Sequence, residues 1–196
     1  MEEFLPIVKY VLKHIQLTEE EEIFFVSLLR ITKVKKKQLI VQPEFVCKHS
    51  SYVVAGLMRA YIIDNKGKEH TIALAIEDWW IGDFNSFIFQ TPATFFVEAL
   101  EDTLLIQLDY EGRQRLLETH PKFEKFFRIT LERLSAALQQ RLLSNLSKSA
   151  EQRYDEFAKK YPQLLNRIPQ YILASYLGFT AEFLSKIRNN KVKKLK

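Results

Sequence analysis

The chain has 196 residues, enough for one large domain or for a medium-sized domain with a small one. Its apolar fraction of 47%, with 15 Phe, excludes a disordered chain, and its single cysteine excludes a disulfide framework or multi-cysteine metal centre within one chain. The net charge of +5 is uneven: residues 149–196 carry +6 and the rest of the chain carries −1.

The N-terminal residues resemble neither an export signal nor a membrane anchor. The opening MEEFLPIVKY is acidic and has no cleavage-like segment. No apolar run approaches the roughly 18 residues that span a bilayer. We therefore expect a cytoplasmic protein with no membrane partner.

Two amphipathic helices are predicted at the start, about Glu2–His14 and Thr18–Leu29. Thr18 followed by Glu21 is a capping-box pattern at the start of the second helix.

From Ile31 to Asp109 short β-rich runs alternate with turns. The predicted strands are Ile31–Val41, Tyr52–Ala55, Leu57–Ile63, Glu69–Ile76, Phe95–Leu100 and Thr103–Leu108. Asp64–Gly67 (DNKG) predicts a hairpin turn between two of them. Many short strands this close together favour a barrel or sandwich over an α/β sheet.

One long helix is predicted from Pro121 to about Ser147. Its apolar stripe has the four-three-four spacing of a coiled-coil seam and consists of Phe127, Leu131, Leu134, Leu138, Leu142 and Leu146. The stripe fits a two-helix dimer contact, which we favour, or packing of the helix on its own β-domain. Ser147–Glu151 (SKSAE) is a plausible hinge after it.

The last segment, Gln170–Asn189, is typical of a helix-turn-helix. Helical patterns at Gln170–Leu177 and Ala181–Asn189 flank Gly178, which can adopt the positive φ that ends the first helix. Thr180 is placed to N-cap the second helix, with Glu182 near its positive end.

The second helix has one apolar and one polar side. At about 100° per residue, Phe183, Leu184 and Ile187 share the side predicted to be buried. The opposite side carries donors and acceptors suited to base edges in the major groove, with Arg188 on a flank: Glu182, Ser185, Lys186 and Asn189. An ordinary solvated helix is the alternative, and the turn upstream favours DNA recognition. The basic tail Lys191–Lys196 is then expected to contact phosphates.

With this order of elements the chain resembles the bacterial Crp–Fnr transcription regulators. The resemblance covers nearly the whole chain and depends on the spacing of several short motifs. These are Gly56, the Asp64–Gly67 hairpin, Ile81-Gly82-Asp83-Phe84 with Ala99, Pro121, and the E-x-x-S-[RK] motif as Glu182, Ser185 and Lys186.

The resemblance implies an α+β fold. A cyclic-nucleotide-binding-like β-roll with N-terminal helices would occupy residues 1–120, and a dimerisation helix residues 121–148. An all-α helix-turn-helix domain with a truncated or absent wing would occupy residues 149–196. Carried over, Glu182, Ser185 and Lys186 read bases, and Thr180, Arg188 and Asn189 complete the DNA-binding set.

The resemblance also implies a cyclic-nucleotide pocket, here a degenerate one. Its residues are Gly82, Asp83, Phe84, Ala93, Thr94, Leu138 and Gln139. Asp83 stands at the position of a ribose-binding Glu, and Ala93 at that of the phosphate-binding arginine. A buried phosphate needs a cation, so we do not expect high-affinity cyclic AMP binding. No cofactor is predicted, and the effector, if one exists, is unknown. The aromatic residues around this segment fit a filled core or a pocket for an apolar effector.

Other chemistry finds no support in the sequence. The four histidines lack metal-ligand spacing, Cys47 fits a buried or incidental thiol, and no nucleotide-loop or nucleophile motif occurs. We therefore predict a dimeric, non-enzymatic regulator of double-stranded DNA, with RNA polymerase as a further candidate partner. The alternative is a small-ligand-binding module that acts through protein contacts.

Overall fold

The computed structural model describes the backbone of residues 2–194 and the side chains of residues 2–190. The chain forms two compact units, Met1–Ile62 with Ala73–Arg133, and Ile63–Ile72 with Leu134–Lys196. The outer half of one β-hairpin thus belongs with the C-terminal helices. The basic tail side chains of residues 191–196 lie outside the described part.

The first unit opens with helices, as predicted. A 3-10 turn at Glu2–Phe4 leads into α1 (Leu5–Leu12), and α2 spans Glu19–Ser27. Thr18 accepts a hydrogen bond from the N–H of Glu21, whose carboxylate accepts one from the N–H of Thr18. The capping box predicted from the sequence is therefore confirmed.

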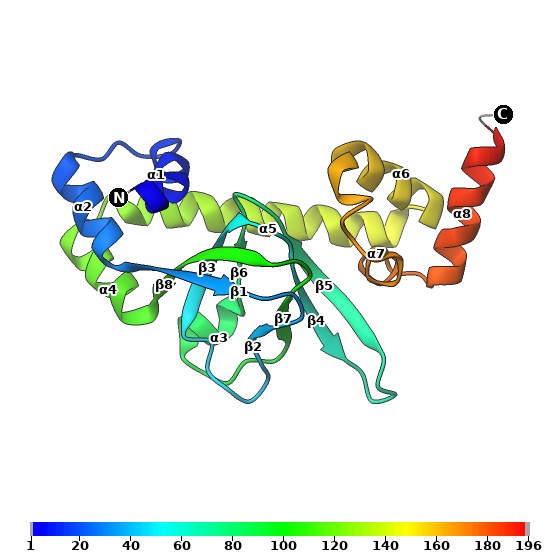
Figure 1. Ribbon diagram of the computed structural model, residues 1–196, viewed down its shortest axis with the longest axis horizontal. Helices are drawn as coiled ribbons and strands as arrows, with labels where there is room; N and C mark the ends of the chain where they lie inside the picture. Colours follow the sequence, from blue (N-terminus) through cyan, green and yellow to red (C-terminus); the bar gives the residue numbers. More distant parts are fainter. Residues whose placement is uncertain (1, 195–196) are drawn as a thin grey trace. The chain divides into compact units, whose positions relative to one another are not determined.

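Two four-stranded antiparallel sheets form the β-roll (Figure 1). The first has the order β1-β8-β3-β6 and the second β2-β7-β4-β5. Their strands are β1 (Leu29–Val34), β2 (Leu39–Val41), β3 (His49–Ala55), β4 (Met58–Ile63), β5 (Glu69–Ala75), β6 (Trp80–Ile81), β7 (Phe96–Ala99) and β8 (Thr103–Asp109). The predicted sandwich or barrel is confirmed.

The single strand predicted at Ile31–Val41 is wrong, because two strands and a turn occupy it. Lys37 at the turn has a φ of 69°, and its N–H donates to the carbonyl of Ala99 at 2.7 Å. The chain thereby leaves the first sheet at β1 and enters the second at β2.

The predicted hairpin turn between β4 and β5 is confirmed. Gly67 has a φ of 76°, and its N–H donates to the carbonyl of Asp64 at 2.9 Å. The Asp64 carboxylate accepts hydrogen bonds from the His70 ring and from the N–H groups of Lys66 and Lys68. These contacts lower the pKa of Asp64 to about 2.

The core of the first unit lies between the first sheet and its helices. Tyr52, Ile106 and Leu108 of the sheet share one buried cluster with helical side chains. Those helical residues include Ile7, Val11, Phe25, Leu116, Phe123 and Phe126. Leu116 belongs to α4 (Tyr110–Thr119) and Phe126 to α5 (Phe123–Ser147), the long helix predicted from Pro121.

The second unit contains the rest of α5 and three further helices, α6 (Ala150–Lys160), α7 (Gln170–Leu177) and α8 (Ala181–Lys194). Ser149 and Gln152 form a second capping box at the start of α6, within the predicted hinge. A short 3-10 turn at Pro162–Leu164 connects α6 toward α7. Among the described residues, no helix is long and apolar enough to cross a membrane.

Candidate nucleic-acid interface and ligand pocket

The turn between α7 and α8 is built as the sequence predicts. Gly178 has a φ of 80° and a ψ of 34°, the left-handed conformation. The N–H groups of Gly178 and Phe179 donate to the carbonyls of Ser175 and Ala174 at 3.1 and 3.0 Å. These two hydrogen bonds form a Schellman motif, which ends α7 before α8 begins.

Thr180 caps the start of α8. Its hydroxyl oxygen accepts a hydrogen bond from the N–H of Phe183 at 3.3 Å. The carboxyl of Glu182 lies at the same helix end, where its own backbone N–H and the Thr180 hydroxyl lower its pKa. Glu182 is therefore held as a hydrogen-bond acceptor at neutral pH.

The facing of α8 agrees with the prediction at most positions. Leu184 and Ile187 are buried against α7, and Glu182, Lys186 and Asn189 are exposed. Arg188 is half-buried on the flank. One predicted burial is wrong: Phe183 is 42% exposed, because its ring rests edge-on against Phe179 at 5.9 Å instead of entering the interface with α7.

Ser185 is half-buried, and its hydroxyl already has two partners. The hydroxyl donates to the carbonyl of Ala181 at 3.1 Å and accepts a hydrogen bond from the Nε2 of Gln170. Since a hydroxyl has one hydrogen and two lone pairs, one lone pair remains for a further donor. The α7 side chain Gln170 thus orients a residue that the sequence placed among the base readers.

Arg153 of α6 connects the long helix to the turn. Its Nη1 donates to the carbonyl of Lys148 at 2.8 Å, and its Nε donates to the carbonyl of Leu177 at 3.0 Å. The guanidinium carbon lies 5.8 Å from the Phe179 ring centroid. One cation therefore satisfies carbonyls at the ends of α5 and α7.

The pocket segment of the β-roll is internally hydrogen-bonded. Asp83 is 1% exposed, and one carboxylate oxygen accepts from the N–H of Ser86 at 3.0 Å, which caps α3 (Phe84–Phe89). The other oxygen accepts from the N–H and hydroxyl of Thr94 at 2.9 and 3.3 Å. Asp83 therefore holds α3 and the following loop together.

The other predicted pocket positions are divided between the two units. Ala93 is buried, and its backbone bonds to Glu44 and Phe45. Gly82 and Phe84, which flank Asp83, are half-buried, and Thr94 is exposed. Leu138 and Gln139 are exposed positions of α5 in the second unit.

Arg59 of β4 is paired with a carboxylate. Its Nε lies 2.6 Å from an oxygen of Glu98, and both side chains are largely buried. The guanidinium also stacks on the Tyr61 ring, 4.0 Å from its centroid. Tyr61 in turn stacks on Phe96 at 5.1 Å.

Comparisons with known proteins agree with this arrangement. The family model for the cyclic nucleotide-binding domain matches residues 31–120. FixK2 from Bradyrhizobium japonicum aligns with a TM-score of 0.75 and 14% identity, covering 85% of each chain. A putative Crp/Fnr regulator from Eubacterium rectale aligns with a TM-score of 0.70 and 19% identity, covering 90% of this chain and 85% of that chain. A mutant of CooA from Carboxydothermus hydrogenoformans aligns with a TM-score of 0.66 and 21% identity, covering 94% of this chain and 83% of that chain. A comparison with curated sequences finds no match.

This chain has the Crp–Fnr fold. The resemblance and the α+β fold class predicted from the sequence are thus confirmed, with a cyclic nucleotide-binding domain at residues 31–120.

The apolar stripe of α5 is largely exposed in this chain. Leu138, Leu142 and Leu146 are 53%, 59% and 78% exposed, and Leu131 is also exposed. Phe127 and Leu134 are half-buried. Aliphatic side chains repeated at this spacing on an exposed helix form a surface suited to a second helix.

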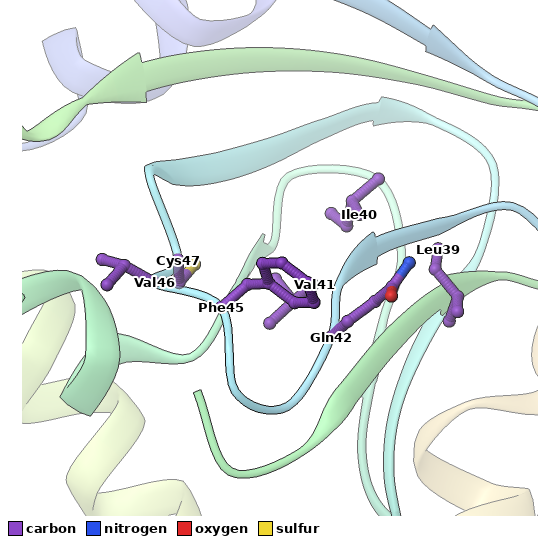
Figure 2. Close-up of a pocket in the computed structure, with 7 residues that line it drawn as sticks. All are labelled: Leu39, Ile40, Val41, Gln42, Phe45, Val46 and Cys47. Atoms are coloured by element: carbon purple, nitrogen blue, oxygen red, sulfur yellow. The ribbon is translucent and has the colours of Figure 1, made fainter. Parts of the chain in front are cut away.

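An open apolar depression lies elsewhere in the Crp–Fnr β-roll, beside β2. Its volume is about 290 Å³, and it is lined by residues 39–42 and 45–47. Figure 2 shows these lining residues, among them Val41 and Phe45. Cys47 in its wall is buried, and burial raises the pKa of its thiol. The described residues contain no His, Cys, Asp and Glu cluster that fits a metal ion.

Sequence reasoning missed three residues that organise the C-terminal unit of this Crp–Fnr fold: Gln170, Arg153 and Arg141. The partners of Arg141 lie 35 to 70 positions away in sequence. In the sequence, Arg153 is distinguished only as one of the basic residues of the segment 149–196. Neither local spacing nor composition signals such contacts, because they depend on the tertiary fold.

Proposed function

We propose that this protein is a dimeric, sequence-specific DNA-binding transcription regulator that does not respond to cyclic AMP. The observation that carries this proposal is the presentation of α8. Its apolar residues Leu184 and Ile187 are buried on α7, while Glu182, Lys186 and Asn189 are exposed. A helix held in this way by a preceding helix and a tight turn can enter the major groove.

The exposed residues of α8 define the chemistry of reading. The carboxylate of Glu182 accepts hydrogen bonds from cytosine N4, and the ammonium of Lys186 donates to guanine O6 and N7. Asn189 suits adenine, and Ser185 offers its remaining lone pair to a base-edge donor. Thr180 and Arg188 complete the proposed DNA-binding set, and the excess charge of residues 149–196 supplies non-specific attraction.

The exposed stripe of α5 supports a homodimer. Two copies that pair through Leu131, Leu138 and Leu142 bury an aliphatic seam that is otherwise in contact with water. A two-fold dimer carries two α8 helices and reads two half-sites of a near-palindrome about one DNA turn apart. RNA polymerase is a further candidate partner.

The internal bonding of the pocket supports a role without cyclic AMP. Both oxygens of Asp83 are occupied by Ser86 and Thr94, and Ala93 brings no cation to the loop. Removing one partner of a buried, hydrogen-bonded charge pair costs roughly 2–5 kcal/mol. A loss of that size weakens phosphate binding about 30- to 5,000-fold. Another effector, or a protein partner, would then shift α5 and the two reading helices.

A selection experiment tests the reader assignment. The wild-type chain is incubated with a library of randomised DNA duplexes, and the enriched duplexes are sequenced. We expect a near-palindromic consensus, and we expect the double variant Glu182→Ala/Lys186→Ala to lose it. Glu151→Ala/Lys159→Ala is the matched control, because it removes the same two charges from exposed positions of α6.

Three results would contradict the proposal. If the Glu182/Lys186 variant enriches the same consensus as wild type, α8 is not the reader. If wild type enriches no consensus at either of two salt concentrations, the chain does not recognise a DNA sequence. Two concentrations are needed because phosphate-dominated binding weakens steeply with salt. If isothermal calorimetry detects tight cyclic AMP binding, the interpretation of Ala93 is wrong.

A further inference from the structure

The outer half of the β4–β5 hairpin, Ile63–Ile72, contacts the helix-turn-helix within the C-terminal unit. β5 is the last strand in its sheet order, so one row of its backbone groups faces away from β4. Such groups need other partners when they are buried. Side chains of α5 and α7 provide them.

Ser175 of α7 bonds to β5 twice. Its hydroxyl oxygen accepts from the N–H of Thr71 at 2.8 Å and its hydroxyl hydrogen goes to the carbonyl of Glu69 at 3.2 Å. One side chain thereby makes the two bonds that a neighbouring strand would make. The first helix of the reader is thus fastened to the hairpin.

Arg141 of α5 adds three more bonds. Its Nη2 donates to the carbonyls of Thr71 at 3.2 Å and Tyr176 at 3.0 Å, and its Nη1 donates to the carbonyl of Ile72. Its guanidinium carbon lies 4.1 Å from the Tyr176 ring centroid. One side chain therefore joins α5, β5 and α7, and we call these contacts with those of Ser175 the Arg141 clasp.

The Arg141 clasp is incompletely satisfied. No carboxylate of the described chain lies within ion-pair distance of Arg141, and burial lowers the pKa of its guanidinium. Its Nε and the buried hydroxyl of Thr71 have no hydrogen-bond partner among the described residues. Unpaired buried polar atoms weaken a network relative to a complete one.

The hairpin also affects the first turn of α8. Lys68 is among the groups that lower the pKa of Glu182, after the helix-end hydrogen bonds. The positive charge of Lys68 in the hairpin therefore stabilises the carboxylate of Glu182, a proposed base-reading residue.

We infer that Arg141 is a positioning residue that sets the orientation of the α7–α8 pair on α5, and with it the spacing of the two reading helices in a dimer. This inference rests on the proposed DNA-binding function. The Arg141 clasp joins the hairpin, α5 and α7 within the C-terminal unit.

Hydrogen–deuterium exchange tests the clasp without DNA. Arg141→Gln should raise deuterium uptake in residues 63–72 and 170–177, Arg141→Lys should restore part of the protection, and Ser175→Ala should raise uptake in the same two segments. Arg128→Gln is the matched control, because Arg128 is an exposed arginine on the same helix, paired with Glu132. Equal uptake in Arg141→Gln and Arg128→Gln would overturn the clasp.

DNA spacing tests the positioning role. The enriched palindrome, the same duplex with one base pair added between its half-sites, and a single half-site duplex are each titrated. Coupling between protein sites spans roughly 5- to 150-fold, and we expect Arg141→Gln to weaken palindrome binding about tenfold. Its half-site affinity should stay within about twofold of wild type, and the penalty for the added base pair should shrink.

The outcomes separate the two proposals. An equal loss on palindrome and half-site would show that Arg141 only stabilises the fold, and an unchanged spacing penalty would refute the positioning role. If wild type binds none of the duplexes, the DNA-binding proposal fails and the positioning role fails with it, while the exchange experiment still decides whether the Arg141 clasp exists. If wild type binds and the variant shows wild-type spacing preference, only the positioning inference fails.

Discussion

Gly178 offers a direct test of how the reader is built. Substitution of Gly178 by Ala forces a residue with a Cβ into a φ of 80°. A Cβ at this position would meet only the Nη2 of Arg153 at 4.0 Å, so no steric clash adds to the backbone cost. That backbone cost is roughly 1–2 kcal/mol for an L-residue in the left-handed region.

Hydrogen–deuterium exchange of α7 and α8 measures this cost. One or two kcal/mol corresponds to a factor of roughly 5–30 in the opening equilibrium, so peptides covering residues 170–190 should exchange faster by about that factor. The affinity for the enriched DNA should fall in parallel, since an opened turn no longer holds α8.

Two controls separate backbone conformation from loss of a glycine. Gly178→Asn should cost less than Gly178→Ala, because Asn enters the left-handed region more readily. Gly67→Ala has a similar φ of 76° and open space around it, so it should accelerate exchange in the hairpin more than in residues 170–190, the reverse of Gly178→Ala. Equal exchange in the Ala and Asn variants of Gly178, or no change in either, would refute the reasoning.

Three further predictions concern the hairpin and the β-roll. Asp64 has a folded pKa of about 2, below its unfolded value of about 4, so its stabilisation is present at neutral pH and disappears as pH falls toward 2. Exchange in residues 63–72 should therefore be faster in Asp64→Asn than in wild type at pH 7, and the stability difference should vanish near pH 2; a constant difference would contradict this. Phe126→Ala removes a fully buried ring and should lower the free energy of unfolding of the β-roll by about 3–5 kcal/mol, measured by urea unfolding with Trp79 and Trp80 as fluorescent probes, and a change below about 1 kcal/mol would show that the ring is not part of the core. Burial raises the pKa of Cys47, so native protein should react with iodoacetamide at pH 8 much more slowly than urea-unfolded protein, and similar rates would place the thiol at the surface.

The elements with local signals were predicted well from the sequence. The capping box at Thr18, the hairpin at Gly67 and the glycine-ended turn at Gly178 each depend on residues within five positions of one another. Local hydrogen bonds and a required positive φ leave their mark in residue type. The long α5 was predicted because its apolar spacing persists over many turns.

The elements without local signals were missed. β6 has two residues and α3 has six, too few for a period to be visible. Phe183 follows the helical period of the buried residues, but its ring packs edge-on against Phe179 of the turn and is 42% exposed. Arg141 donates to backbone carbonyls of β5 and α7. Every residue has a backbone carbonyl, so no sequence pattern predicts which carbonyls Arg141 contacts.

α5 runs without interruption through 25 residues, about 37 Å at 1.5 Å per residue. A rod of that length acts as a lever arm. Tilting it by about five degrees at one end displaces the other by roughly 3 Å, close to the 3.4 Å that separates successive base pairs. A movement too small to remodel a protein core is therefore enough to change which operator spacing a pair of such rods accepts.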